Sequence, residues 1–230
     1  MRKFSRRQKE NLSKIKTSTY TNLEDAIKTL KKTATANFIE SVELHVNLNI
    51  DPKYVDQQLR ATVILPHGIG KTIRIAVLVE NNSLNEIKET EADIIGNDEL
   101  LENINAGILN FDLLLTTPSM MPKLAKLGRV LGPKGLMPSP KSGTVTTALK
   151  STIEEFKKGK FEYKADRTGI VHANFGKSDF DEKELLSNLQ TLYKSIEQNR
   201  PPGVKGTYVK SLYICTTMGP SIKLDPTLLI

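Results

Sequence analysis

A Gly-Lys-Thr tripeptide at residues 70–72 is the feature of this sequence most suggestive of nucleotide chemistry. A phosphate-binding loop needs another glycine five residues before the tripeptide glycine, so that backbone N–H groups surround the phosphates at the N-terminus of a helix. That position is Leu65, and the alternating β-branched residues from Ile73 onward predict a strand instead of a helix. We therefore expect a turn in which Gly68 and Gly70 adopt positive φ, and a nucleotide-dependent α/β enzyme is only the alternative function.

Histidine and cysteine, which often ligate transition metals, are rare in this sequence. His45, His67 and His172 show no metal-ligand spacing, and His172 lies in an alternating segment that favours a structural hydrogen bond. The sequence contains one cysteine, Cys215, and this number excludes an internal disulfide and a cysteine-based zinc site. A single cysteine also favours a reducing compartment. No nucleophile and base are paired in the sequence, so we expect no enzyme activity, no cofactor and no bound metal.

Positive charge is the strongest compositional signal, because the 230 residues carry a formal net charge of +7 and a pI of about 9.3. Such a charge favours a polyanionic partner such as nucleic acid. Residues 113–153 contain no Asp or Glu and include a long Gly/Pro loop, which leaves lysines available to phosphates, although a charged run is also typical of a solvated surface. The candidate tRNA- or RNA-backbone-binding residues are Lys123, Lys126, Arg129, Lys134 and Lys141.

The hydrophobic pattern predicts the elements that position these residues. Strict alternation predicts strands, a 3.6-residue apolar period predicts helices, and residues 21–24 are interpreted as a capping box that opens a helix. We interpret residues 161–166 and 170–175 as a hairpin. We expect helices at residues 5–16, 84–90, 97–106 and 181–198, from residue 21 and after Pro118, and strands at residues 42–50, 60–65, 73–80, 92–96, 111–117, 161–166, 170–175 and 207–217.

After Pro66 the sequence predicts short apolar strands that alternate with helices, and near Lys160 the earlier pattern returns. These two changes predict the domain organisation. We expect an α+β protein of two domains. Residues 1–66 and 159–230 form a discontinuous α+β domain from both termini, and residues 67–158 form an inserted, Rossmann-like, three-layer α/β domain with a mostly parallel sheet. No apolar run reaches membrane-spanning length, and the N-terminal residues lack the apolar core of a secretory signal, so we expect no membrane partner.

Six segments carry a resemblance to a known family: KTATANFIESVELHVNLNIDP, LPHGIGK, KLGRVLGPKGLMPSPKSGT, DRTGIVHANFGK, PPGVKGTY and CTTMGPS. On these segments, which follow the family order across nearly the whole chain, the sequence resembles the L-one family of large ribosomal subunit proteins in its bacterial and organelle-encoded form. The resemblance implies the split two-domain fold and a place on the mobile side stalk beside the tRNA exit site. It also implies a hinge between the domains, for which Gly68, Gly70 and Gly159 are the candidates.

The resemblance further implies which residues contact a stalk helix of ribosomal RNA, all of them in domain one. Phe38 could stack on a base or sugar or instead fill the core, Thr217 could hydrogen-bond a 2′-hydroxyl, and Gly219 could let the backbone approach a minor groove. Asn37 departs from the family, in which a basic residue is common, so one phosphate contact is weakened or moved. The implied rRNA-binding residues are Phe38, Ser41, Glu43, Arg167, Thr168, Gly169, Ser211, Thr217, Met218 and Gly219.

The implied function is that of a structural constituent of the large ribosomal subunit. It would bind 23S-type rRNA and, through domain two, assist the release of deacylated tRNA from the exit site. A second implied role is translational repression, by binding a leader in its own messenger RNA. The expected location is the ribosome, in a plastid (chloroplast) stroma or a bacterial cytoplasm, and the abundance of Asn, Lys and Ile suits an AT-rich genome of either kind.

Overall fold

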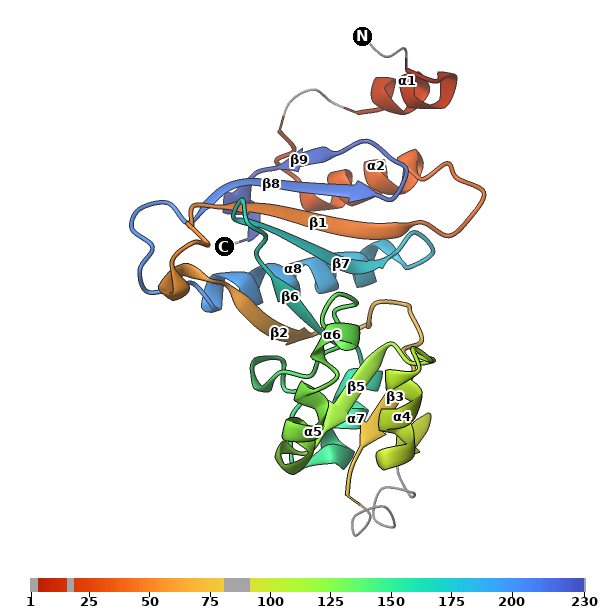
Figure 1. The fold of residues 1–230 in the computed structure, drawn as a ribbon. Helices are drawn as coiled ribbons and strands as arrows, with labels where there is room; N and C mark the ends of the chain where they lie inside the picture. Colours follow the sequence, from red (N-terminus) through yellow and green to blue (C-terminus); the bar gives the residue numbers. More distant parts are fainter. Residues whose placement is uncertain (1–3, 16–18, 81–91, 230) are drawn as a thin grey trace. The chain divides into compact units, whose positions relative to one another are not determined.

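The computed structural model describes residues 4–15, 19–80 and 92–229 (Figure 1). The chain divides into two compact units: Met1–Gly70 with Phe161–Ile230, here called unit one, and Lys71–Lys160, here called unit two. The α+β class predicted from the sequence is confirmed. The acidic helix expected at residues 84–90 lies outside the described residues. Within the described ranges, no helix combines the length and apolarity that crossing a bilayer requires.

Unit one contains a four-stranded antiparallel sheet in the order β7–β1–β8–β9. The helices α2 and α8 pack against one face of this sheet and share its core (Figure 1). The bounds are β1 (Ser41–Leu48), β7 (Ile170–Lys177), β8 (Val209–Thr216), β9 (Ile222–Leu224), α2 (Leu23–Thr33) and α8 (Glu182–Gln198).

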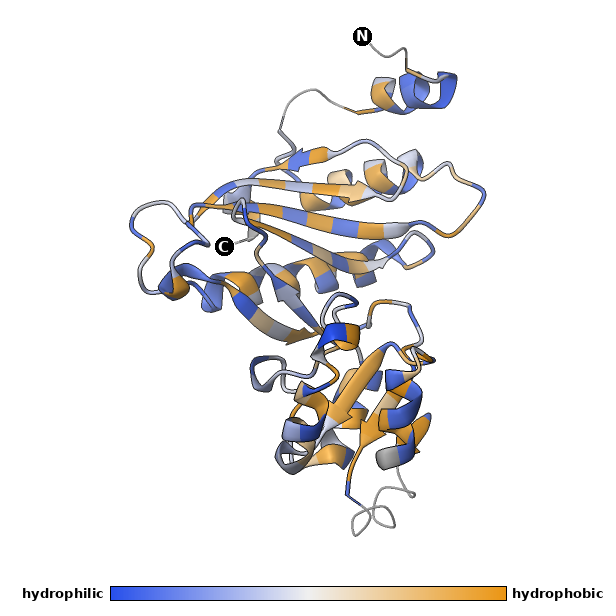
Figure 2. Ribbon diagram, in the orientation of Figure 1, coloured by the Kyte–Doolittle hydropathy of each residue, from blue (hydrophilic) through white to orange (hydrophobic). Residues whose placement is uncertain are grey.

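The alternation of apolar and polar residues explains why this sheet has one buried face. Burial alternates at every position of β1, and the same alternation is visible as changing colour along that strand in Figure 2. From the other side, α8 contributes an apolar stripe at helical spacing, as the sequence predicted. The buried residues are Val42, Leu44, Val46 and Leu48 of β1 and Leu185, Leu189, Leu192 and Ile196 of α8.

The helix starts in unit one are set by side-chain caps. The short helix α1 (Arg6–Ser13) begins after Ser5, whose hydroxyl accepts a hydrogen bond from the Gln8 N–H at 3.3 Å. The predicted capping box at residues 21–24 is wrong, because α2 is capped one residue later by Asn22. The Asn22 side-chain oxygen accepts from the Glu24 N–H at 3.0 Å, and this short side chain satisfies a free helix N–H directly.

The predicted hairpin of residues 161–166 and 170–175 is also wrong. β6 (Lys160–Lys164) pairs with β2 (Arg60–Ile64) in a separate two-stranded sheet, whereas β7 pairs with β1. An isolated bridge between Ala165 and Val171 joins the two segments at their turn. The strands diverge beyond that turn because each joins a different sheet, which the local sequence pattern does not specify.

Unit two contains a three-stranded parallel sheet in the order β4–β3–β5, and this confirms the predicted parallel α/β arrangement. Its strands are apolar on both faces and appear almost continuously apolar in Figure 2. One face shares a core with α4, α5 and α6, and the other shares a core with α7. The bounds are β3 (Ile75–Leu78), β4 (Ile94–Gly96), β5 (Leu113–Thr116), α4 (Asp98–Asn105), α5 (Met121–Ala125), α6 (Gly128–Leu131) and α7 (Leu149–Lys157).

Several short elements were not predicted from the sequence. They include α7, which begins at Leu149 after Ala148, a residue that provides no side-chain cap, so that the usual start signal is missing. The strand β9 has three residues, too few for a periodic pattern. The others are α6 and the 3₁₀ turns η1 (Val55–Gln57), η3 (Pro118–Met120), η4 (Pro140–Ser142) and η5 (Pro226–Leu229).

Candidate nucleic-acid interface

The sheet face opposite α2 and α8 carries polar side chains on three adjacent strands. Because alternation turns every second residue away from the core, the strand register decides which of these side chains are neighbours. Glu43 pairs with Cys215, and His45 pairs with His172 on one side and with Tyr213 on the other. We call this surface the outward face; its residues are Ser41, Glu43, His45 and Asn47 of β1, His172 and Asn174 of β7, and Ser211, Tyr213 and Cys215 of β8.

At one end of the outward face, the carboxylate of Glu40 joins two loops that are distant in sequence. One oxygen accepts a hydrogen bond from the Ala36 N–H at 3.0 Å, and the other accepts from the Met218 N–H at 2.9 Å. Burial alone raises the pKa of Glu40, but these hydrogen bonds outweigh it and the pKa is lowered. Because Glu40 is itself only 1% exposed, it acts as a fixed internal link between the loops.

The loops that Glu40 joins present two large apolar side chains to solvent. Phe38 is 54% exposed and Met218 is 50% exposed. The alternative that Phe38 fills the core is therefore wrong. Apolar side chains held outward beside a polar sheet face are available for stacking and contact with a partner.

Thr217 and Gly219 have internal roles at the same end. The Thr217 hydroxyl accepts from the Ser41 N–H at 3.0 Å and lies 3.3 Å from the Ser41 carbonyl oxygen, to which it donates. One acceptor lone pair of that hydroxyl is left for a partner. A Cβ added to Gly219 would lie 2.2 Å from Thr216 Oγ1, so the chain needs glycine here for its own packing.

At the other end of the outward face, Asp166 closes the turn that precedes β7. Its carboxylate accepts from the Thr168 N–H at 2.9 Å, from the Thr168 hydroxyl at 2.8 Å and from the Ile170 N–H at 2.8 Å. The hydrogen bond from Ile170 is the main reason that the pKa of Asp166 is lowered. Gly169 has φ of 81°, and a Cβ there would lie 3.1 Å from the Ile50 carbonyl oxygen. The turn therefore displays Arg167 and Thr168 to solvent.

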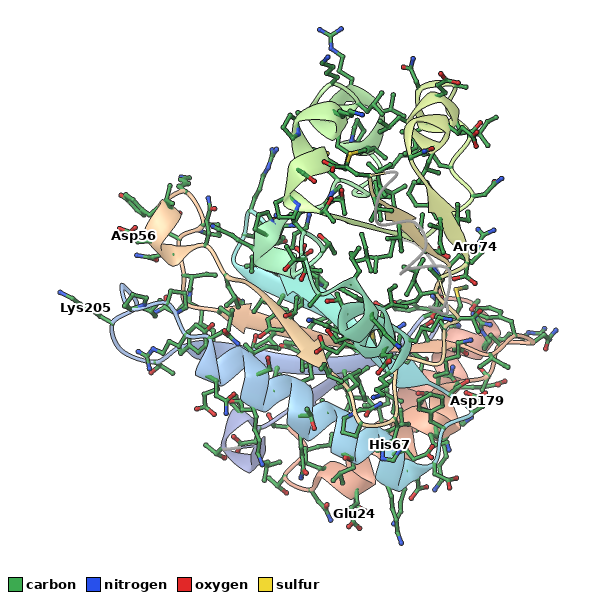
Figure 3. The ribbon with its side chains drawn as sticks, turned by 90° about the horizontal axis from the view of Figure 1, so that it is seen from below. Glu24, Asp56, His67, Arg74, Asp179 and Lys205 are labelled. Atoms are coloured by element: carbon green, nitrogen blue, oxygen red, sulfur yellow. The ribbon has the colours of Figure 1, made fainter. Side chains whose placement is uncertain are left out.

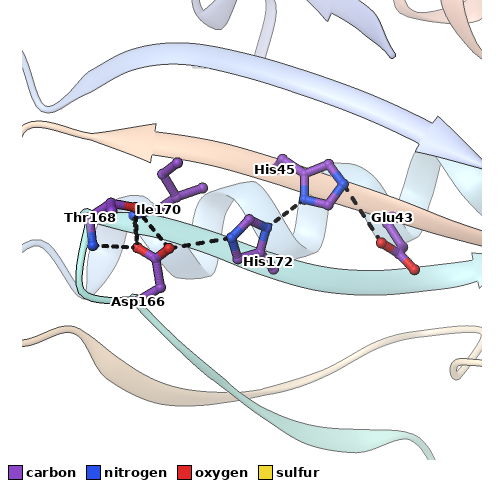
Figure 4. Close-up of polar contacts among 6 residues, drawn as sticks. All are labelled: Glu43, His45, Asp166, Thr168, Ile170 and His172. Carbon is purple, nitrogen blue, oxygen red and sulfur yellow. Dashed lines mark hydrogen bonds and ion pairs between the residues drawn. The ribbon is translucent and has the colours of Figure 1, made fainter. Parts of the chain in front are cut away.

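Between the two ends, a line of polar contacts crosses the sheet (Figure 4). His172 Nε2 lies 3.7 Å from Asp166 Oδ2, the Nδ1 atoms of His172 and His45 are 2.7 Å apart, and His45 Nε2 lies 3.7 Å from Glu43 Oε2. Burial is the main cause that lowers the pKa of His45. The charge of His172 lowers this pKa further, whereas the charge of Glu43 raises it. Burial also raises the pKa of the Cys215 thiol to about 11, and Glu43 adds to this.

The structure thus collects the ten predicted rRNA-binding residues into two groups, one at each end of the outward face. Phe38, Ser41, Glu43 and residues 217–219 form one group, and residues 167–169 lie with Ser211 in the other. Ser41 and Asn47 are six positions apart on β1, which separates the ends by about 20 Å. The sequence prediction missed Glu40 and Asp166, and it did not pair the two histidines. The structural hydrogen bond expected of His172 is present, with His45 as its partner. His45 carried a usable signal as well, since it alternates with Glu43 on a predicted strand.

The predicted hinge glycines Gly68 and Gly70 adopt the expected positive φ, with values of 63° and 74°. The buried side chain of Asn188 holds the turn before them: its Nδ2 donates to the Gly68 carbonyl oxygen at 3.0 Å, and its Oδ1 accepts from the His67 N–H at 3.1 Å. Figure 3 shows His67 beside α8, the helix that carries Asn188. The third glycine, Gly159, has φ of 107°.

The Gly-Lys-Thr turn leads into β3, so the structure lacks the helix that a phosphate-binding loop requires. Lys71 Nζ lies 3.0 Å from Asp112 Oδ1, and Arg74, labelled in Figure 3, lies 3.6 Å from the other oxygen of that carboxylate. The hydrogen bond from Lys71 is the main cause of the lowered pKa of Asp112. Elsewhere in unit two, the side chains of the predicted basic group are exposed: Lys123, Lys126, Arg129, Lys134 and Lys141.

Comparison with known proteins gives a consistent result across the chain. A family model described as the ribosomal protein L1p/L10e family matches residues 30–220. The large ribosomal subunit protein uL1c of Trieres chinensis is 69% identical over 225 residues, which cover 98% of each chain. The uL1c protein of Phaeodactylum tricornutum is 67% identical with the same coverage. The large ribosomal subunit protein uL1 of a Synechococcus strain is 56% identical over 98% of this chain and 95% of its own.

Proposed function

The chain belongs to the ribosomal protein L1p/L10e family, and we propose that it binds the rRNA of a large ribosomal subunit through the outward face of unit one. Members of this family are structural ribosomal proteins, and the chain is not an enzyme. The names uL1c and uL1 of its relatives support a ribosome of a plastid or of a bacterium as its location.

The observation that carries this proposal is the pair of exposed apolar side chains fixed by Glu40. Phe38 and Met218 stand on different loops, and each is about half exposed, yet the buried Glu40 carboxylate links both loops. An aromatic ring held outward in this way stacks on any nucleotide base without a large entropic cost. The link therefore supports recognition of RNA by stacking at this end of the face.

The rest of the outward face offers the polar contacts that RNA requires. Hydroxyl and amide groups of Ser41, Asn47 and Ser211 suit 2′-hydroxyl and base-edge contacts in the wide minor groove of RNA. Arg167, exposed on the turn closed by Asp166, suits a phosphate. These contacts make RNA, rather than double-stranded DNA, the expected partner.

The test is a binding titration with an in vitro transcribed stalk segment of large-subunit rRNA. Phe38→Ala should weaken affinity by about 1 to 3 kcal/mol, which is about 5- to 150-fold, while the thermal unfolding temperature stays unchanged because the ring is exposed. Tyr54 is a matched control, since its ring is 63% exposed elsewhere on unit one, and Tyr54→Ala should leave the affinity unchanged. Equal affinities for Phe38→Ala and the unmodified protein would contradict the proposal.

We also propose that the exposed basic residues of unit two contact the backbone of exit-site tRNA and assist its release. The support is their exposure in a stretch without carboxylates, because such contacts depend on charge and carry little sequence information. Bending between the units is part of this proposal. Since Asn188 holds the Gly68 carbonyl within unit one, we place the bend after Gly68, at Gly70 and at the return near Gly159.

A variant with Gln at Lys123, Lys126, Arg129, Lys134 and Lys141 tests the tRNA proposal. It should slow single-turnover tRNA release on assembled ribosomes and reduce the salt dependence of the rate, while affinity for the stalk RNA stays nearly unchanged. A double variant, Lys150→Gln with Lys158→Gln, controls for a general loss of charge in unit two. Lys150 lies on α7, and Lys158 follows the last residue of that helix. An unchanged release rate in the five-fold variant would mean that these side chains only solvate the surface.

Translational repression follows as a second role if the chain's own messenger contains a leader that resembles the stalk RNA. The same outward face would bind it, so Phe38→Ala should weaken leader binding and stalk binding in parallel. A leader that binds the Phe38→Ala variant as tightly as the unmodified protein would separate the two roles.

A further inference from the structure

Three side chains with good metal-ligating atoms converge on the outward face between β1 and β8. His45 Nε2 lies 3.1 Å from Cys215 Sγ and 3.7 Å from Glu43 Oε2, and the three ligating atoms all lie within 4.8 Å of one another. Each residue is half-buried, so the site is sheltered but can be reached from solvent. The convergence results from register, because Glu43 pairs directly with Cys215, and His45 follows two residues later on the same face.

The line of contacts beyond His45 orients its ring for metal binding (Figure 4). A single assignment of protons satisfies the whole line: His172 Nε2–H faces Asp166, and His45 Nδ1–H donates to His172 Nδ1. His45 Nε2 then has a free lone pair directed toward Cys215 and Glu43. A ligating histidine commonly donates its other ring N–H to a neighbouring acceptor in this way, which fixes its tautomer and orientation.

We propose that Glu43, His45 and Cys215 form a Zn²⁺ site with three protein ligands and one open position. Thiolate, imidazole and carboxylate together suit zinc, whereas magnesium and calcium prefer oxygen ligands alone. Tetrahedral bonds to zinc of about 2.0 to 2.3 Å place the ligating atoms about 3.3 to 3.6 Å apart. The separations of His45 Nε2 from Cys215 Sγ and Glu43 Oε2, 3.1 and 3.7 Å, are close to this range. Rotation of the Glu43 side chain, which is 40% exposed, closes the remaining distance.

The site also gives Glu43 a role. A bare carboxylate is unfavourable on a face that is to meet phosphates. A Zn²⁺ ion held by the Glu43 carboxylate, the Cys215 thiolate and neutral His45 forms a site without net charge, because binding releases the thiol proton, so the negative charge of Glu43 is neutralised. The open position faces solvent on the outward face, where a phosphate or water oxygen can complete the coordination. This consequence rests on the proposed rRNA binding, whereas the metal site itself does not.

The test uses full-length, untagged protein freed of metal with a chelator, and contains no RNA. Titration with Co²⁺ should give one equivalent of binding, with a thiolate-to-cobalt absorption band and the visible bands of tetrahedral cobalt, and Zn²⁺ should displace it. Cys215 is the only cysteine in the sequence, so any thiolate band belongs to it. Absence of the band would overturn the proposal.

Variants assign the ligands. Cys215→Ser should abolish the thiolate band, and His45→Gln and Glu43→Gln should lower the affinity for zinc at least tenfold. His67→Gln is the matched control, since His67 belongs neither to the proposed ligands nor to the line of contacts that orients them, and it should bind as the unmodified protein does. Asp166→Asn should weaken binding by about 10- to 100-fold, because it removes the charge at the end of the orienting line. Full affinity in both His45→Gln and Glu43→Gln, with circular dichroism unchanged, would also overturn the proposal.

Discussion

Replacing Glu40 by Gln tests whether one buried carboxylate organises the RNA-binding end of the outward face. Both carboxylate oxygens of Glu40 accept backbone N–H groups, at 3.0 and 2.9 Å. Gln keeps one acceptor oxygen and turns an NH₂ group toward the other N–H. A buried donor left without a partner costs about 1 to 3 kcal/mol, and exchanging a charged acceptor for a neutral one costs roughly 1 more. We expect Glu40→Gln to lower the free energy of unfolding by about 2 to 4 kcal/mol at neutral pH.

Acid provides a second, independent measurement on the same variant. The folded-state pKa of Glu40 is lowered below its unfolded value, so the carboxylate stabilises the fold above the unfolded pKa, and this stabilisation is lost as the pH falls through the folded value. The difference in unfolding free energy between the unmodified protein and Glu40→Gln should therefore shrink in acid. Urea unfolding followed by far-UV circular dichroism at several pH values measures it.

The control for Glu40→Gln is Glu197→Gln, which removes an exposed carboxylate from α8 and should change stability by less than about 0.5 kcal/mol. RNA affinity gives the functional result. If Glu40 acts by holding Phe38 and Met218, the effects of Glu40→Gln and Phe38→Ala on affinity should be less than additive. A stability difference that is absent at neutral pH, or that grows in acid, would refute this account.

Three further variants test the internal contacts beside the proposed interface. Thr217→Val removes two hydrogen bonds to Ser41, so urea unfolding should show a loss of about 1 to 3 kcal/mol, and stalk-RNA affinity should fall with it; an effect on affinity alone would assign the hydroxyl to RNA. Gly219→Ala should destabilise by about 1 to 3 kcal/mol through its clash with Thr216 Oγ1, and Thr216→Ala in the same chain should restore part of that loss; no rescue would mean that another contact limits Gly219. Asn188→Leu removes the hydrogen-bond partner of backbone groups in His67, Gly68 and Phe175. The free energy of unfolding should therefore fall by about 2 to 4 kcal/mol, as measured by thermal unfolding. An unchanged unfolding midpoint would refute the role of Asn188 in fixing the turn.

The long-range contacts of the interface could not be predicted from the sequence. Glu40 lies 178 residues from Met218, and His45 lies 127 residues from His172 and 170 from Cys215. An irregularity in the pairing of β1 with β7, between Val42 and Glu43, shifts the register before the histidines meet. Since a slip of one residue turns every side chain to the opposite face, the pairing of His45 with His172 depends on the register of β1 with β7, which this bulge changes and no local pattern indicates.

The sequence by itself determined what local chemistry can determine. Alternating apolar residues specified the strands of unit one, a 3.6-residue apolar period specified the buried face of α8, and continuous apolar segments specified the parallel sheet of unit two. Six segments identified the family, which the comparisons establish. Only the tertiary structure decided that β6 pairs with β2 instead of with β7, and that Glu40 joins two loops. It also decided that the Thr217 hydroxyl is hydrogen-bonded to Ser41 within the protein. Pairing partners and buried hydrogen bonds are chosen by the packing of the whole domain, since each distant contact forms only where the strand register and the core bring its atoms within reach.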